Sequence, residues 1–165
     1  MNNFRFCDVC FDIMTIKKSF IVKFKEKSQM VESFNGWVFL ILFLLNWAGG
    51  AMYAYQTIFN TVPWLNKYGI HESAVLPTRV LGTFVSAATL LGLYILFTGP
   101  MGTWPYFVFM FLQSIIFVVV GYSTVTNSNA SKLEGVNYTA EAYIAPAIFT
   151  VLNGVLIYGL GDKIW

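Results

Sequence analysis

Four long segments without a charged residue in their interior are the feature that most restricts the fold of this chain. Each is close to the roughly 20 helical residues needed to cross about 30 Å of hydrocarbon in a bilayer. None alternates polar and apolar residues as the strands of a membrane barrel do, whereas a helix satisfies its own backbone hydrogen bonds in lipid. The sequence therefore predicts an all-α integral membrane protein. The segments run approximately from Gly36 to Thr57, Val80 to Thr98, Trp104 to Tyr122 and Ala140 to Leu160.

The composition supports a membrane protein rather than a soluble one. Of the 165 residues, 57% are hydrophobic and only 11% are charged, whereas an ordinary soluble domain carries about 25% charged residues. The alternative is a soluble protein whose buried helices are apolar all round, which the low charge disfavours. A chain of this length has no room for a separate soluble catalytic domain. We expect residues 30–165 to form one transmembrane domain.

The connections between the segments predict how they are arranged. The second and third are joined only by "GPMGT", in which Gly99 and Pro100 break the helix, so we expect these two helices to be antiparallel neighbours. The loop 58–78 is rich in aromatic residues, which suits the membrane interface. Four crossings place both chain ends on the same side. The prediction is an antiparallel four-helix bundle, integral and multi-pass, in a membrane of the bacterial inner (plasma) type.

Residues 1–29 differ from the rest, because they hold more than half of the ten Lys and Arg residues and both cysteines. One interpretation is a basic cytoplasmic arm that meets anionic headgroups, at about 1 kcal/mol per basic residue near the surface. The other is a leader outside the natural protein, with synthesis starting at Met30, because Lys25 and Glu26 can be encoded by a ribosome-binding sequence. The first interpretation places both termini in the cytoplasm, and the second weakly reverses that orientation.

Motifs for catalysis and for cofactors are not found in the sequence. Cys7 and Cys10 have thioredoxin-like spacing, but the redox motif needs a βαβ context and a zinc site needs four ligands. The chain has two cysteines and one histidine. No phosphate loop, nucleophile elbow or dinucleotide fingerprint occurs, and a net charge of +2 is slight for nucleic-acid binding. We expect a non-enzymatic protein with no metal, no cofactor and no nucleic-acid partner.

Three amide side chains interrupt the apolar segments near their middles: Asn46, Gln113 and Asn153. An unpaired amide in lipid is costly, so these groups should point into the bundle and bond one another or backbone carbonyls. One interpretation is structural, with about 0.6 to 2 kcal/mol from each interhelical bond. The other is that they line a path for a ligand or a transported solute.

Charges at the ends of the segments are the remaining candidates. Arg79 precedes the second segment, where the helix dipole is also positive, so it requires an anion. Glu141 begins the fourth segment at the same side of the membrane, and His71 and Glu72 lie in the preceding loop. Arg79 forms either a structural ion pair with one of these carboxylates or a contact with an anionic ligand or lipid headgroup, for which a guanidinium is well suited.

The order of these features resembles the DoxX-like and related small four-helix membrane proteins. The resemblance spans roughly Trp37 to Leu160 and rests on "VPWLNKYGI", on "TRVLGTFVSAATLLGLYIL" with its Arg79-x-x-Gly82 element, and on the short hairpin that follows. Most members of that group have no established activity, and some are similar to membrane subunits of quinone-linked oxidoreductase systems. This chain lacks an obvious redox ligand.

Three functional hypotheses follow. The first is a non-enzymatic accessory subunit or a lipid- or anion-binding membrane module that works through the Arg79 end. The second is a small transporter-like oligomer that uses the interior amides, and the third is a membrane subunit of a quinone-linked oxidoreductase system. The expected partners are the lipid bilayer and either other membrane subunits or further copies of the chain.

Overall fold

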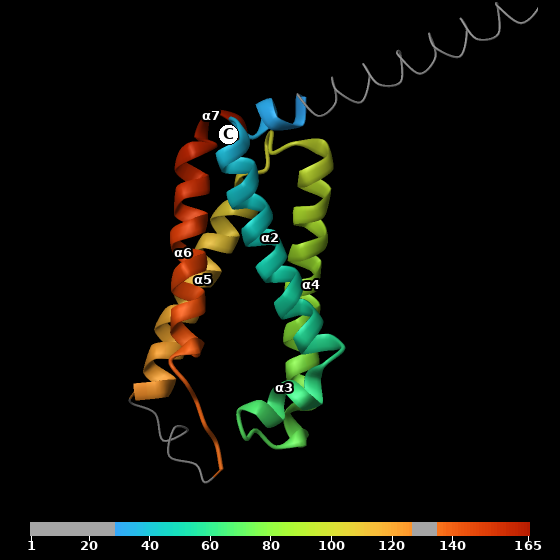
Figure 1. The fold of residues 1–165 in the computed structure, drawn as a ribbon, viewed down its shortest axis with the longest axis vertical. Helices are drawn as coiled ribbons and strands as arrows, with labels where there is room; N and C mark the ends of the chain where they lie inside the picture. The colour runs from blue at the N-terminus through green and yellow to red at the C-terminus, as the bar shows by residue number, and fades with distance from the viewer. Residues whose placement is uncertain (1–28, 127–134) are drawn as a thin grey trace, which may run out of the picture.

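The computed structural model describes residues 29–126 and 135–165, and in this part of the chain every regular element is a helix (Figure 1). The four predicted segments are confirmed as long helices, each apolar enough to cross a membrane. They are α2 (Trp37–Ile58), α4 (Val75–Thr98), α5 (Trp104–Thr126) and α6 (Glu141–Gly159). Residues 1–28, which make up nearly all of the expected basic arm and hold both cysteines, lie outside the described residues.

The connection between α2 and α4 is partly helical rather than a plain loop. It contains α3 (Thr61–Lys67) and the short 3-10 helix η1 (Glu72–Ala74). The Trp64 ring packs edge-on against Tyr53 of α2 and against Tyr68, with ring centroids 5.8 and 5.5 Å apart. These aromatic contacts hold α3 against the end of α2.

Helix α4 begins at Val75, earlier than the predicted Val80. Pro77 is compatible with the first turn, because a backbone N–H is not needed there for an intrahelical bond. The preceding turn is capped by His71, whose Nδ1 accepts a hydrogen bond from the Ser73 N–H at 3.1 Å. Arg79 is therefore more than one turn inside the helix, beyond the reach of the dipole effect expected from the sequence.

The helices pack as two pairs, α2 with α4 and α5 with α6, and α2 also contacts α6 (Figure 1). The expectation that the second and third segments are antiparallel neighbours is not confirmed, because α4 and α5 are not among the closely packed pairs of the described helices. They approach near the hairpin, where the Tyr106 hydroxyl lies against Gly92. The bulk of that tyrosine separates the two backbones.

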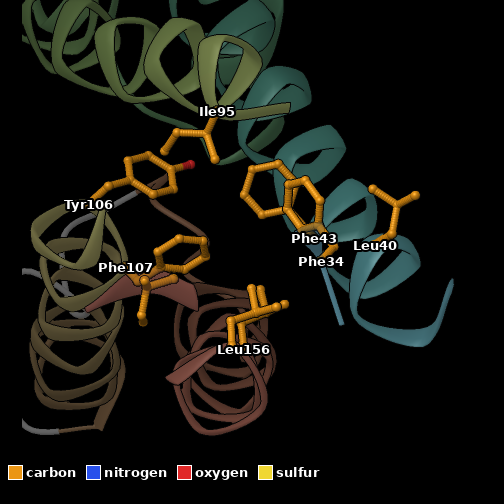
Figure 2. Close-up of a cluster of buried hydrophobic side chains, with 9 residues drawn as sticks. Phe34, Leu40, Phe43, Ile95, Tyr106, Phe107 and Leu156 are labelled. Atoms are coloured by element: carbon orange, nitrogen blue, oxygen red, sulfur yellow. The ribbon is translucent and has the colours of Figure 1, made fainter. Parts of the chain in front are cut away.

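A cluster of buried side chains joins the two pairs at the end where the chain enters α2 (Figure 2). Figure 2 shows aromatic rings from α2 and α5 converging on aliphatic side chains of α4 and α6. The Phe43 ring lies 5.0 Å from Phe34 and 5.9 Å from Phe107, measured between centroids. The cluster consists of Phe34, Leu40, Phe43, Ile95, Tyr106, Phe107, Leu156, Leu160 and Ile164.

Polar contacts at the same end tie the start of α2 to the short C-terminal helix α7 (Gly161–Ile164). The Asn35 amide donates to the Gly159 carbonyl at 2.9 Å and to the Asp162 carboxylate. Asn35 has φ 52°, in the left-handed region that asparagine tolerates better than most residues. The hydrogen bond from the Asn35 amide lowers the pKa of the Asp162 carboxyl below its ordinary value of 3.8.

Replacing Asn35 by glycine should raise the pKa of Asp162 toward 3.8, because the amide donor is removed while glycine keeps the left-handed backbone unstrained. Since the folded pKa is depressed, the stability that this contact contributes is present above pH 3.8 and is lost as the pH falls through the folded value. Carboxyl carbon shifts followed against pH in micelles measure this pKa. Lys163→Ala is the control, with a smaller expected shift, and an unchanged pKa in Asn35→Gly contradicts the assignment.

Candidate functional site

Arg79 is exposed on α4 and has one described hydrogen-bond partner. Its Nε donates to Thr61 Oγ1 at 3.4 Å, and the buried Thr61 hydroxyl in turn donates to the Thr57 carbonyl at 2.7 Å. Among residues 29–126 and 135–165, no carboxylate lies within 4.0 Å of the guanidinium. Its charge is therefore not neutralised by the described protein.

Glu141, one of the partners expected for Arg79, bonds to other groups. Its Oε2 accepts from Lys67 Nζ at 2.9 Å and from the Tyr68 hydroxyl at 3.1 Å. Of the alternatives left open for Arg79, the Arg79–Glu141 ion pair is not present among the described residues, because α3 places Lys67 beside the start of α6. The hydrogen bond to Glu141 raises the pKa of Lys67. Both side chains are more than half exposed, so the pair adds little stability.

His71 and Glu72 do not pair with Arg79 either. His71 bonds Ser73 in the cap described above, which is a structural role for its ring. Glu72 belongs to the same exposed turn and forms no ion pair with the arginine in the described structure. Neither Glu72 nor Glu141, the two carboxylates expected near Arg79, forms an ion pair with it among the described residues.

The surroundings of Arg79 along α4 are apolar and open. Leu76, one turn before it, is 73% exposed, and Phe84, more than one turn after it, is 66% exposed. Arginine extends its aliphatic stem along such surfaces while its charged head reaches the polar region. A charge of this kind at the end of an apolar helix is typical of the headgroup layer of a membrane.

The interior amides form a second polar group. Asn46 of α2 and Asn153 of α6 are 2% and 1% exposed, respectively, and Asn46 Nδ2 donates to Asn153 Oδ1 at 3.0 Å. The predicted bond between intramembrane amides is present for this pair. Gln113 does not join it. It lines a cavity on the other side of Asn46 instead.

That cavity lies between α2, α4 and α5. It offers about 20 Å³ to the centres of water-sized molecules, which exceeds the roughly 10–15 Å³ that one water requires. Its wall includes Trp47 and Tyr106, which sequence reasoning did not predict as site residues. Trp47 is held there by a hydrogen bond from Nε1 to the Thr89 carbonyl at 3.0 Å. The lining residues are Asn46, Trp47, Gly50, Val85, Ala88, Thr89, Tyr106, Met110 and Gln113.

Comparisons with known proteins identify no relative. No protein-family model, no curated protein and no solved structure matches the chain. The resemblance to DoxX-like proteins therefore stays a prediction from the sequence motifs.

Proposed function

We propose that this chain is a non-enzymatic, multi-pass membrane protein whose Arg79 end binds anionic lipid headgroups, as a lipid-binding module or an accessory subunit. The observation that carries the proposal is the guanidinium of Arg79, which is exposed, has no described carboxylate partner and is bordered by outward apolar side chains. A phosphate oxygen in the headgroup layer supplies the missing anion.

Insertion in the bilayer is supported by the outer surfaces of the four long helices. Large apolar side chains point outward along all four, for example Phe109 at 54% and Val151 at 67% exposure. Soluble monomers rarely expose apolar patches above a few hundred Å², whereas lipid covers such surfaces. We infer an antiparallel bundle of four spanning helices with both chain ends on one side, in a plasma membrane of the bacterial type.

The hydrogen bond from Arg79 to Thr61 leaves the terminal guanidinium nitrogens available for a phosphate. A guanidinium carries five N–H donors, and the described protein uses only the one on Nε, which bonds Thr61. The terminal nitrogens retain the planar pair of donors that recognises phosphate in a bidentate manner. The Thr61 hydroxyl thereby orients the guanidinium without neutralising it.

Arg79→Gln should weaken the preference for anionic lipid about tenfold, because a charge-assisted hydrogen bond is worth about 1.5–3 kcal/mol. Native mass spectrometry of the purified protein, mixed with phosphatidylglycerol and phosphatidylcholine, measures that preference. Lys67→Gln is the matched control. It removes a cation at the same end of the protein, but Glu141 already neutralises that cation. An unchanged preference in Arg79→Gln, or an equal loss in Lys67→Gln, contradicts the proposal.

The cavity described above does not favour the transporter-like alternative. The cavity beside Asn46 and Gln113 has room for a molecule of water's size, which is less than a solute of several heavy atoms needs. We therefore keep the lipid-binding module as the proposed function.

A further inference from the structure

The orientation of the buried Asn46 amide is fixed by its neighbours. Asn153 Nδ2 donates to the Phe149 carbonyl at 2.8 Å, so Asn153 must present its oxygen to Asn46. Asn46 in turn must present its Nδ2 to that oxygen, at 3.0 Å. The consequence is that Asn46 Oδ1 points away from the amide pair, and this buried oxygen has no hydrogen-bond partner in the described protein.

A buried acceptor of this kind needs a donor. Burying a polar group without a hydrogen bond is costly, and nearly all such groups in folded proteins have a protein or water partner. Asn46 lines the cavity between α2, α4 and α5, whose volume of about 20 Å³ admits a water molecule. The residue that carries the orphaned oxygen therefore lines a space that can hold a donor.

The rest of the cavity wall supplies further bonding groups. Gln113, on α5, is half-buried and its amide makes no hydrogen bond to a described residue. The Thr89 hydroxyl donates to the Val85 carbonyl at 2.8 Å, so its oxygen can still accept. A buried water typically makes about three hydrogen bonds, and these groups together with Asn46 provide them.

We propose that this cavity is a binding site for one water molecule, which donates to Asn46 Oδ1 and bonds the Gln113 amide. Such a water bridges α2 to α5, and so connects the two helix pairs on the side where α4 and α5 do not pack closely. The site is separate from Arg79 and does not depend on lipid binding. It is a structural part of the interior and not a stage of a permeation path.

Gly50 provides a matched pair of substitutions that tests the site. It lies one turn after Asn46 on the same face of α2 and lines the same cavity. A Cβ added there meets only Thr89 Oγ1, at the ordinary contact distance of 3.5 Å. Gly50→Ala therefore fills the cavity without a donor, whereas Gly50→Ser fills it with a hydroxyl that can replace the water's bond to Asn46.

The direct measurement is a cross-peak between water and the Asn46 side-chain amide protons, recorded on protein labelled with ¹⁵N at asparagine. The wild-type protein should show the cross-peak, and both Gly50 variants should lose it. Asn153 is the internal control, because its amide is not in the cavity wall. A missing cross-peak in the wild-type protein, or one that persists in both variants, overturns the proposal.

Thermal unfolding of the two variants gives an independent readout. The midpoint Tm of Gly50→Ser should exceed that of Gly50→Ala by about 2 to 4 °C, although alanine has the higher intrinsic helix propensity. The reversal of the propensity order is expected because only serine offers Asn46 Oδ1 a donor. A Gly50→Ala variant that is at least as stable as Gly50→Ser overturns the assignment of that oxygen as the water's acceptor.

Discussion

Replacement of Asn153 by leucine should destabilise the protein by about 1 to 3 kcal/mol, the cost of leaving a buried polar group without its partner. Leucine has the same number of side-chain heavy atoms, branched at the same position, so the substitution leaves no cavity. Asn46 Nδ2 loses the oxygen that it bonds at 3.0 Å, and neither position has access to water outside the helices, since both side chains are at most 2% exposed.

A double-mutant cycle distinguishes the lost bond from a general packing effect. Asn46→Leu combined with Asn153→Leu removes both partners, so the pair should lose less stability than the sum of the two single losses, with a coupling of about 0.5–3 kcal/mol. Unfolding in detergent, followed by the change in helical circular dichroism, measures all four proteins. Strictly additive losses would show that the two amides do not stabilise each other.

Gly121→Val should destabilise the protein at least as much as Asn153→Leu does, by about 3 kcal/mol. A Cβ at Gly121 would lie 2.3 Å from the Ala142 carbonyl oxygen and 2.9 Å from its carbon. Both are backbone atoms of α6, and they cannot rotate away as a side chain can. The substitution therefore forces α5 and α6 apart along the most extensive helix contact of the protein.

The same interface contains a matched control for this prediction. A Cβ at Gly154 of α6 meets only the Phe111 ring edge, at 3.4 Å, and that ring can shift. Gly154→Ala should therefore stay within about 1 kcal/mol of the wild-type protein, since alanine also gains helix propensity. If Gly121→Val and Gly154→Ala unfold at the same denaturant concentration, the close backbone contact at Gly121 does not determine the stability of the α5–α6 interface.

The existence of the long helices was predictable because it depends on a local property, the length of an uncharged apolar run. The start of α4 was not predictable in this way, because Arg79 ends the uncharged run without ending the helix. A charged residue is compatible with a helix interior where its face is exposed, and Pro77 is compatible with the first turn. Both residues therefore belong to a helix that begins at Val75.

The partners of the helices depend on contacts that connection lengths do not reveal. A five-residue hairpin indicates only that α4 and α5 are close at one end. The close packing of α4 is instead against α2, where a Cβ at Gly82 would lie 2.7 Å from Thr57 Oγ1. That close approach pairs α4 with α2. Close approaches of this kind at single glycines cannot be read from connection lengths.

The polar residues of the candidate sites were predictable from the sequence, but their hydrogen-bond and ion-pair partners were not. Asn46 and Asn153 bond each other because an apolar interior offers few alternatives, but the sequence did not tell which of the three amides would remain apart. The sequence placed Arg79 and Glu141 at similar depth, which says nothing about the direction in which each faces. The pairing of Lys67 with Glu141 is not predictable from the sequence, because it depends on how the short helix α3 packs.

The division into two helix pairs has a consequence for the order in which the protein assembles on the ribosome. Helices α2 and α4 both precede Gly99, and α5 and α6 both follow Thr103. All residues of the contacts between α2 and α4 are therefore synthesised before α5 and α6, whereas the partner of Asn46, Asn153, is synthesised only with α6. The bond between these two amides can form only after Asn153 of α6 has been synthesised.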